Sequence, residues 1–309
     1  QYLYLLNFKP TNGESAFHSF TTTRNRYMSA SSSSSTNLLT SEEANGGVTV
    51  LPGVEDKYGG VVTEISHPID PSAFSALLRT SLSNWTLQGK KGVWIKLPRH
   101  LIGLAETAVK EGFWFHHAEK DYLMLVYWIP KDDNTLPFNA SHRVSIAAFV
   151  INHKKEVLVV QEKTGRTKGK GIWKFPTGVV NEGEYIHDGS VREVKEETGV
   201  DTEFVQVLAF RQTHKTFFEK SNLFFVCMLK PLSFEINAQE SEIEAAQWMP
   251  WEEYTKQPFV QNHELLRYMT DICSAKTNGD YEGFTTIPVS EHDQQGNLYF
   301  NSRDLLPRH

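Results

Sequence analysis

Two blocks of alternating hydrophobic and polar positions follow one another along the chain. In the first block, short runs with the two-residue period of strands alternate with stretches that have the helical period of 3.6 residues. The predicted strands are 61–65, 92–97, 113–116 and 122–129, and the predicted helices are 71–85 and 101–110. This alternation predicts a small α/β domain, which we place at residues 47–131.

A polar connector with two prolines, residues 130–138, separates the two blocks. Beyond it, apolar runs at 144–151 and 157–161 flank residues 152–155, a turn sequence that predicts a hairpin. Further strands are predicted at 205–211 and 223–229, and further helices at 251–256 and 264–274. We place the second domain at residues 139–275.

The two ends of the chain lack such patterns. Residues 1–46 are predicted to form a flexible extension, because 29–36 is a low-complexity stretch rich in serine. Residues 1–35 combine a few basic residues with many Ser and Thr and a single acid, which is compatible with an organelle transit peptide. We predict a cytoplasmic protein, with the chloroplast or mitochondrion as the alternative, and a C-terminal tail over 276–309.

Composition and charge narrow the classes of function. The net charge of −6 and the isoelectric point near 6.1 argue against a broad basic surface for duplex nucleic acid. They are compatible with a small anionic substrate, because a bound metal can invert the charge of an acidic site. No apolar stretch is long enough to span a bilayer, and the 2 cysteines favour a reducing compartment.

The segment 178–200, GVVNEGEYIHDGSVREVKEETGV, carries the candidate chemistry. We predict a helix that begins near His187 or Asp188, with Asp188 as its N-cap, and that ends before Gly199 in the C′ position. Gly189 falls in the first turn, where it costs about 1 kcal/mol relative to alanine. The first turn is therefore expected to be loose.

Three carboxylates, Glu193, Glu196 and Glu197, lie on adjacent rows of this helix. Like charges at this spacing repel, and a divalent cation such as Mg²⁺ or Mn²⁺ would resolve the conflict. Arg192 could hold one of the carboxylates through a forked ion pair. The hexapeptide REVKEE alone favours a solvated surface helix, so the longer segment has to decide between the two interpretations.

The whole segment resembles the Nudix box, in which a glycine is followed at fixed spacings by a glutamate, an Arg-Glu pair, a Glu-Glu pair and a second glycine. Every position is filled, by Gly178, Glu184, Arg192, Glu193, Val194, Glu196, Glu197, Gly199 and Val200. The resemblance implies a Nudix α/β/α sandwich. It also implies that divalent metal assists hydrolysis of a diphosphate bond in a nucleoside-diphosphate derivative.

The resemblance extends over about residues 50–285 to plant Nudix hydrolases, on segments such as YGGVV, LQGKKGVW, FHHAE and GIWKFPTGVV. It implies a small acetyltransferase-like domain before the Nudix domain, and kinship with the vertebrate antisense-fibroblast-growth-factor protein. It points to ADP-ribose or NADH as the substrate. The downstream proline of many ADP-ribose hydrolases and the SQPW-type array of NADH hydrolases are both absent from the sequence, which leaves that choice open.

Two alternatives remain beside this assignment. One is a Nudix hydrolase of another substrate, such as coenzyme A, a dinucleoside polyphosphate or a nucleoside triphosphate. The other is a nucleotide-sensing regulator with little turnover, which the intact set of box carboxylates disfavours. The predicted partner is a small nucleotide, without nucleic acid or membrane, and a homodimer is left open.

The box and its neighbours supply the candidate site residues. The catalytic set is Glu193, Glu196, Glu197, Arg192 and Glu242, and the metal set is Glu193, Glu196, Glu197 and Gly178. Trp173 or Phe175 would stack on adenine, and Lys170 would reach the phosphates. Core packing is the alternative for the two aromatic residues, and solvent exposure is the alternative for Lys170 and Glu242.

In the first domain, His116 and His117 are adjacent on a predicted strand. Their side chains are therefore expected on opposite faces, which argues against a shared metal ion and favours a packing or interface role. This domain lacks a glycine-rich loop for the pyrophosphate of acetyl-coenzyme A, which argues against acetyl transfer.

Overall fold

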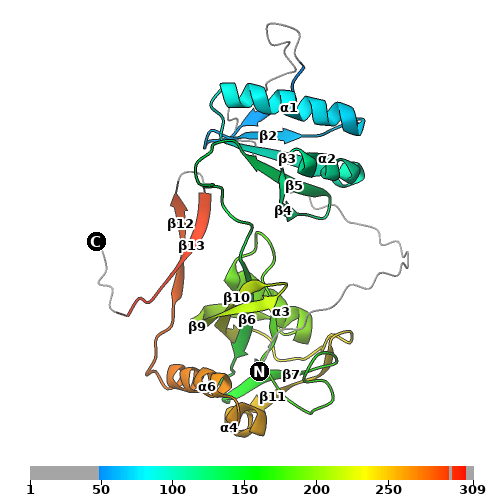
Figure 1. Cartoon of the computed structure of the whole chain (residues 1–309). Helices are drawn as coiled ribbons and strands as arrows, with labels where there is room; N and C mark the ends of the chain where they lie inside the picture. Colours follow the sequence, from blue (N-terminus) through cyan, green and yellow to red (C-terminus); the bar gives the residue numbers. More distant parts are fainter. Residues whose placement is uncertain (1–48, 292–293, 304–309) are drawn as a thin grey trace. The chain divides into compact units, whose positions relative to one another are not determined.

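The computed structural model describes residues 49–291 and 294–303 (Figure 1). The chain forms two compact units and passes from one to the other between Ala140 and Ser141. The predicted N-terminal extension, residues 1–46, and its transit-peptide alternative lie outside the described residues. Within the described part, no helix is both long enough and apolar enough to cross a membrane.

The first unit is a five-stranded sheet in the order β1-β2-β3-β5-β4, and it confirms the predicted α/β class. Its strands are β1 (Val54–Glu55), β2 (Val61–Glu64), β3 (Gly92–Pro98), β4 (Trp114–Ala118) and β5 (Tyr122–Trp128). Strands β2 and β3 are parallel, so the chain between them must cross over, and helix α1 (Pro71–Leu87) makes that crossover. Phe74 and Leu78 of α1 are fully buried in the same core as Ile95 and Leu125.

The two predicted helices of this unit differ in their start signals. Asp70 caps α1 by accepting hydrogen bonds from the backbone N–H groups of Ser72 and Ala73, at 2.9 and 3.2 Å. The second helix has no capping side chain and is divided into the 3₁₀ helix η1 (Arg99–Leu104) and helix α2 (Ala105–Lys110). Gly103, a poor helix former, lies just before the division.

The expectation that His116 and His117 point to opposite faces is wrong. Strand β4 has a register shift against β5 between Phe115 and His117, and such a bulge breaks the alternation of side chains. The Nδ1 atoms of the two imidazoles lie 2.6 Å apart, and Nε2 of His116 lies 2.8 Å from the carbonyl oxygen of Pro137. The pair therefore ties the edge strand to the connector, in agreement with a packing role.

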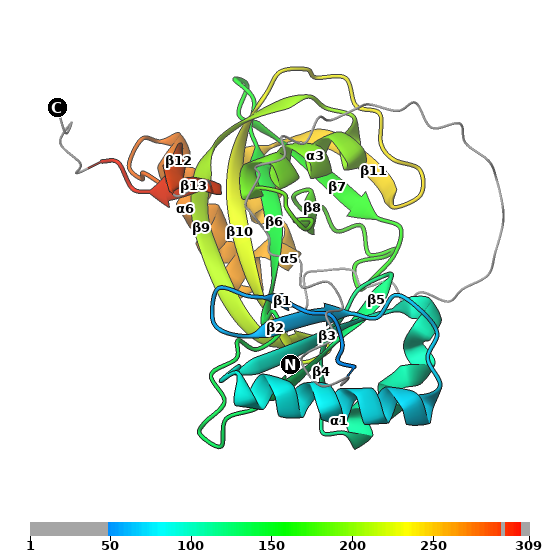
Figure 2. The ribbon, with the colours of Figure 1, turned by 90° about the horizontal axis from the view of Figure 1, so that it is seen from above.

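The second unit is an α/β/α sandwich (Figures 1 and 2). A four-stranded sheet has the order β8-β6-β10-β9, and a two-stranded sheet pairs β11 with β7. The strands are β6 (His142–Val150), β7 (Glu156–Glu162), β8 (Thr177–Val179), β9 (Thr202–Phe217), β10 (Lys220–Pro231) and β11 (Ile243–Pro250). Strands β6 and β10 are parallel, whereas β9 pairs with β10 in the antiparallel sense.

Alternate residues of β6 enter two different cores. Ile146 and Ala148 pack in a cluster with helix α3 (Ile186–Thr198), whereas Ala147 and Phe149 pack in a cluster with the C-terminal helices. Those helices are α4 (Trp251–Lys256), α5 (Pro258–Gln261) and α6 (Glu264–Thr277). All four β6 residues are at most 1% exposed, so the sheet is covered on both faces and α3 is held firmly against one of them.

The predicted hairpin after the connector is half right. Asn152 forms the expected turn, since its Oδ1 accepts hydrogen bonds from the N–H groups of Lys154 and Glu156, at 2.8 and 3.0 Å. The flanking strands meet at the bridge between Ile151 and Val157 and then diverge into different sheets. A turn sequence reports only local geometry, whereas the parallel partner of β6 is β10, which lies much later in the chain.

The prediction of an unpatterned tail over 276–309 is wrong for its middle part. There β12 (Thr285–Glu291) and β13 (Gln294–Phe300) form an antiparallel hairpin. Pro288 and Gly296 conceal the strand pattern, because both residue types are disfavoured inside strands. The hairpin lies beside β9 (Figure 2), where a bridge joins Val207 to Phe284.

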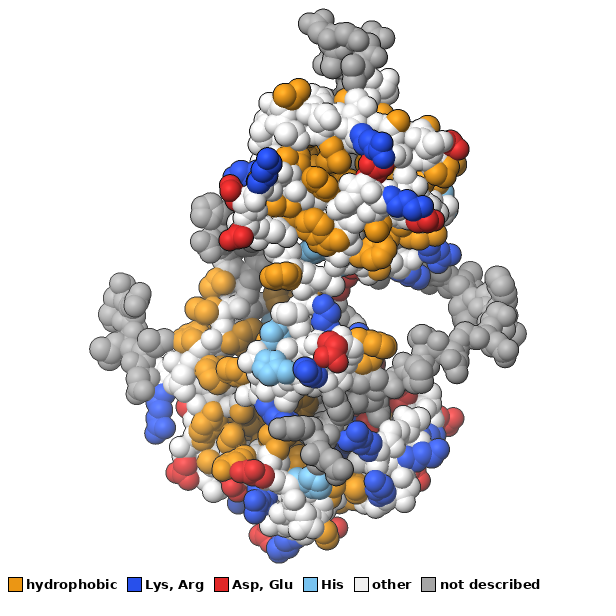
Figure 3. Space-filling model, in the orientation of Figure 1, with side chains coloured by type: hydrophobic (Ala, Val, Ile, Leu, Met, Phe, Trp, Pro, Cys, Tyr) orange, Lys and Arg blue, Asp and Glu red, His pale blue; other side chains and the backbone are white. Residues whose placement is uncertain are grey.

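On the face drawn in Figure 3, Lys and Arg side chains are scattered among acidic and hydrophobic ones. The whole chain carries 31 basic and 37 acidic residues, so the mixture on this face follows the overall composition.

Candidate active site

Helix α3 carries the predicted carboxylates, and its end is fixed as the sequence predicts. Gly199 has a φ of 74° and donates its N–H to the carbonyl oxygen of Lys195 at 2.9 Å, so the predicted C′ glycine is confirmed. The predicted N-cap is wrong, because the helix begins at Ile186 and its N-cap is Tyr185, which makes no side-chain capping bond. Asp188 instead lies within the first turn, where its negative charge suits the helix dipole.

Gly189 in the first turn is explained by a close approach. A Cβ atom at this position would lie 3.1 Å from Oε2 of Glu184 and 3.2 Å from Cγ2 of Val180. The glycine weakens the helix by about 1 kcal/mol relative to alanine. In exchange, it lets the loop that carries Glu184 lie directly against the helix.

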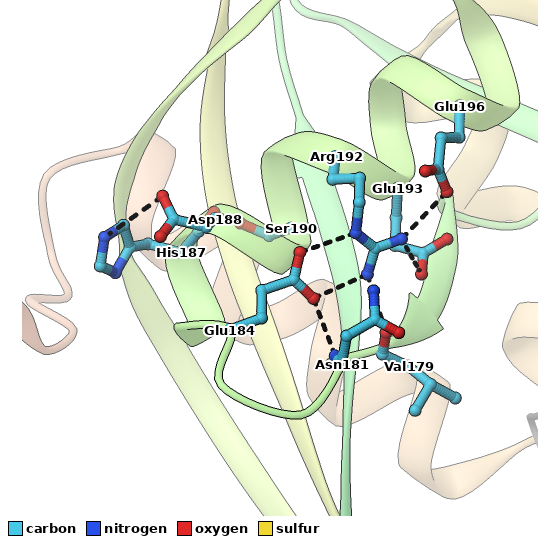
Figure 4. A network of polar contacts seen from close by, with 9 residues as sticks. All are labelled: Val179, Asn181, Glu184, His187, Asp188, Ser190, Arg192, Glu193 and Glu196. Carbon is cyan, nitrogen blue, oxygen red and sulfur yellow. Dashed lines mark hydrogen bonds and ion pairs between the residues drawn. The ribbon is translucent and has the colours of Figure 1, made fainter. Parts of the chain in front are cut away.

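One guanidinium group connects the loop, the strand end and the helix (Figure 4). Arg192 forms a forked pair with Glu184, through Nε to Oε1 at 2.7 Å and Nη2 to Oε2 at 2.8 Å. Its Nη1 donates to Glu193 at 2.8 Å and to Glu196 at 2.9 Å, and its Nη2 also donates to the carbonyl oxygen of Val179 at 2.9 Å. The sequence anticipated one oriented carboxylate, and the structure shows three.

These contacts set the charge states of the paired groups. Hydrogen bonding from Arg192 holds the pKa of the Glu184 carboxyl below its ordinary value, and the same pair raises the pKa of Arg192. Burial raises the pKa of Glu193, although hydrogen bonding from Arg192 opposes that shift. Glu184 is therefore the carboxylate that stays negatively charged beside Arg192. Burial, in contrast, destabilises the negative charge of Glu193.

Gly178 provides the space that the Glu193 carboxylate occupies. It lies in β8 opposite Ile146, and a Cβ atom at position 178 would overlap the Glu193 carboxyl group. Any other residue would push that carboxylate out of its place. The role of Gly178 as a metal ligand stays a prediction, but its need for the smallest side chain follows from the packing.

Glu197 is the buried acid of the helix. It is 7% exposed, and its Oε2 has no hydrogen-bond partner among the described residues. Burial raises the pKa of Glu197 to about 8, with a further rise from the neighbouring Glu193 and an opposing effect from Lys174. A buried acceptor that lacks a partner and faces a like charge is what a divalent cation would relieve.

The carboxylates are not gathered around one centre in this structure. Among the described residues, no three His, Cys, Asp or Glu side chains are arranged as a formed metal site. Glu193 and Glu196 share Arg192 instead, and the Glu196 side chain is 52% exposed. The donors are nevertheless all carboxylate oxygens, and Oε2 of Glu197 lacks a hydrogen-bond partner among the described residues, which fits a hard cation such as Mg²⁺ or Mn²⁺.

Sequence reasoning missed a buried ion pair beside Glu197. The Lys174 side chain, 8% exposed, contacts the Glu162 carboxylate, and its Nζ donates to Oγ1 of Thr177 at 3.0 Å. The available signal was a single lysine inside the apolar run IWKFP, because lysine is almost never buried without a partner. Lys174 adds the one positive charge that opposes the rise in the pKa of Glu197.

Comparisons with known proteins bear on the family of the chain. Residues 141–268 match the family model described as NUDIX domain, and residues 51–129 match the one described as Nudix hydrolase domain. Nudix hydrolase 2 of Arabidopsis thaliana is 81% identical over 279 residues, which cover 90% of this chain and 99% of that protein. The chain belongs to the Nudix hydrolase family. This confirms the predicted relationship to the plant Nudix hydrolases.

More distant proteins share parts of this Nudix hydrolase. The human Nucleoside diphosphate-linked moiety X motif 6 is 36% identical over 218 residues, which are 68% of each chain. A solved NUDIX hydrolase from Nitrosomonas europaea covers 45% of this chain and 90% of its own, at 20% identity and a TM-score of 0.37. The acetyltransferase-like character of the first unit stays a prediction.

The remaining predicted residues lie in different environments of the Nudix hydrolase. Phe175 is 3% exposed, and its ring stacks on Tyr254 at 4.8 Å between centroids, so it belongs to the core and is not free to stack on adenine. Trp173 is half-buried, and its backbone N–H and carbonyl oxygen both bond to the side chain of Gln257. Lys170 is exposed on the loop before it, and Glu242 is half-buried in front of β11.

We predict that Gly178→Ala disables the Nudix hydrolase without unfolding it. The new methyl group displaces the flexible Glu193 side chain from its site and leaves the surrounding backbone intact. A displacement of about 1 Å at a catalytic group can cost about 100-fold in rate. We expect a loss of that order in kcat, measured at saturating Mn²⁺, with little change in Tm.

The matched control is Gly103→Ala in η1, where a Cβ atom would meet nothing within 4 Å. This variant should keep full activity. Wild-type activity of the Gly178→Ala variant would show that the position of Glu193 does not matter for catalysis.

We predict that the metal-free Nudix hydrolase loses stability as the pH rises. The raised pKa of Glu197, about 8 against an ordinary 4.5, means that the folded state binds more protons than the unfolded state between these values. Stability is then fully present below the lower value and is lost as the pH rises through the higher one. Tm measured in EDTA should fall from pH 5 to pH 9.

Substitution separates this effect from general titration. Glu197→Gln should flatten the dependence of Tm on pH, whereas Glu235→Gln at an exposed acid should leave it unchanged. Identical profiles for the wild type and Glu197→Gln would contradict the assigned environment of Glu197.

Proposed function

We propose that this Nudix hydrolase cleaves the diphosphate bond of ADP-ribose, NADH or both, with Mg²⁺ or Mn²⁺ as cofactor. The products would be AMP with ribose 5-phosphate, or AMP with reduced nicotinamide mononucleotide. The observation that carries the proposal is the buried Glu197 carboxylate with its unpaired oxygen, on a helix whose Nudix box is complete. Such a group is costly to bury alone, and a divalent cation stabilises it.

Glu193, Glu196 and Glu197 are the residues that would hold the cation, with Gly178 beside Glu193. When bound, the cation supplies positive charge to the diphosphate and makes water more acidic. Arg192 keeps the carboxylates of Glu193 and Glu196 oriented, since both accept from its Nη1. The positive charge of Lys174, which contacts Glu162, balances part of the negative charge around Glu197.

Glu242 is the proposed acceptor of the proton from the attacking water. It precedes Ile243, which pairs with Glu162 across the β7–β11 sheet, and its carbonyl oxygen accepts from the N–H of Lys163 at 2.8 Å. Glu162 contacts Lys174, whose charge acts on Glu197. These successive contacts connect the turn that carries Glu242 with the surroundings of the Nudix carboxylates.

Substrate binding is assigned to the segment before β8. Gln257 holds the backbone N–H and carbonyl oxygen of Trp173, whose half-buried side chain packs against the core cluster, and the exposed part of the indole ring would be a stacking surface for adenine. Lys170 is exposed on the preceding loop and would pair with a phosphate. Phe175 is omitted, because its ring is already stacked within the core.

The same proposal covers the organisation of the chain. Residues 47–131 form an accessory domain and 139–275 the catalytic domain, with 276–309 as a C-terminal segment that contains the β12–β13 hairpin. The partner is a small nucleotide, and the protein acts in the cytoplasm. The mixed surface charge of Figure 3 and the net charge of −6 support a partner other than nucleic acid.

A substrate panel tests the assignment. The carboxylates and Trp173 would contact the adenosine diphosphate half that ADP-ribose and NADH share. We therefore expect the kcat/KM values for ADP-ribose and NADH to lie within about two orders of magnitude of each other, or about 2.7 kcal/mol in transition-state binding. dGTP and coenzyme A should be poorer substrates under the same Mg²⁺ and Mn²⁺ conditions. A clear preference for either of them would overturn the substrate class but not the Nudix chemistry.

A Glu197→Gln variant tests the chemistry itself, because the amide cannot neutralise a cation. We expect kcat to fall by at least about 100-fold for whichever substrate is best. The conservative change at the exposed Glu235 is again the control. Nucleotide binding without turnover by the wild type would instead favour the sensor.

A further inference from the structure

Backbone hydrogen bonds attach the β12–β13 hairpin to strand β9 of the second unit. Phe284, the residue before β12, forms two backbone hydrogen bonds with Val207 of β9, at 3.0 and 2.7 Å. The close approach depends on Gly283, where a Cβ atom would overlap the carbonyl oxygen of Val207. Asn301, after the hairpin, donates its Nδ2 to the carbonyl oxygen of Glu282 at 2.9 Å and closes the segment at its base.

The start of α3 needs support from outside the helix. Its N-cap, Tyr185, makes no side-chain capping bond. Gly189 lies in the first turn and weakens it. Isolated helices of this length are marginal in water, so the first turn depends on tertiary contacts.

The hairpin supplies two such contacts. The hydroxyl group of Tyr299 lies 2.9 Å from Nδ1 of His187, and the hydroxyl group of Tyr185 donates to the carbonyl oxygen of Gln295 at 3.3 Å. The rings of Tyr185 and His187 stack, with their centroids 5.4 Å apart and an angle of 7° between their planes. The hairpin therefore contacts both members of one stacked pair. Tyr299 also packs against the apolar cluster that includes Ile186 of the helix.

The same turn carries the catalytic arrangement. Tyr185 follows Glu184, the carboxylate that Arg192 grips with two hydrogen bonds. In Figure 4, His187 lies apart from the group around Arg192, so Tyr299 of the hairpin contacts the helix away from the carboxylates. A shift of the first turn would therefore move Glu184 and, through Arg192, the orientation of Glu193.

We propose that the β12–β13 hairpin is a positioning element for the Nudix helix, and that Tyr299, through His187, is its main positioning residue. The proposal rests on the metal site proposed above. Losing one hydrogen bond of ordinary strength changes the balance between the ordered and the frayed first turn by about 2- to 10-fold. The hairpin then orders the first turn of α3, and with it the carboxylates that would bind the cation, without contacting the substrate.

The test compares Tyr299→Phe with Tyr281→Phe in the full chain. Tyr281 is the matched control, because its hydroxyl group donates to the carbonyl oxygen of Leu208 at 2.6 Å and not to α3. Hydrogen–deuterium exchange of residues 186–198 is measured in EDTA, and Mn²⁺ dissociation constants are measured from the EPR signal of free Mn²⁺. We expect Tyr299→Phe alone to speed exchange at the start of α3 and to weaken Mn²⁺ binding by about 2- to 10-fold.

Hydrolysis of ADP-ribose by Tyr299→Phe should recover to within about twofold of the wild type when Mn²⁺ is saturating, since no catalytic group is lost. Equal exchange in α3, or equal Mn²⁺ constants, for the two variants would overturn the proposal. If the wild type binds Mn²⁺ but cleaves neither ADP-ribose nor NADH, the proposed substrates fail, whereas the exchange and EPR comparisons still decide the role of the hairpin.

Discussion

The arrangement of the active site depends on one guanidinium group. Arg192 joins the loop at Glu184, the strand end at Val179 and the helix at Glu193 and Glu196. The forked geometry of arginine makes this possible, since a lysine could not hold Glu184 in two places and still reach the other acceptors. Three segments that have no covalent reason to stay together are therefore fixed by the same side chain.

That arrangement has to accommodate more negative charge than it neutralises. Hydrogen bonding from Arg192 lowers the pKa of Glu184, whereas Glu197 lies deeper, and burial raises the pKa of its carboxyl to about 8. The positive charge of Lys174 opposes this rise in pKa, but Lys174 is already paired with Glu162. The site is thus left short of positive charge at one buried oxygen, which is the physical reason to expect that a divalent cation, and not another side chain, completes it.

Local patterns predicted most elements, whereas contacts between distant segments could not be predicted. The capping residues expected near 187 and 199 predicted the helix, and the fixed spacing predicted the carboxylates, because both are properties of neighbouring residues. The parallel partner of β6 lies far away in the chain, whereas the bulge that unites His116 with His117 and the burial of Lys174 depend on contacts with the neighbouring strands β5 and β7. The β12–β13 hairpin was not predicted because Pro288 is disfavoured inside strands. Pairing of β12 with β13 overrides that local preference.

Chemistry and selectivity occupy different parts of this Nudix hydrolase. The carboxylates of α3 would act on a diphosphate, which many nucleotides share, so they cannot by themselves distinguish one substrate from another. Discrimination has to come from groups that touch the rest of the molecule, and the exposed loop with Lys170 and the half-buried Trp173 are placed before β8, outside the box. A complete box therefore identifies the class of reaction, whereas a choice between the proposed substrates would be made by side chains whose spacing follows no fixed pattern.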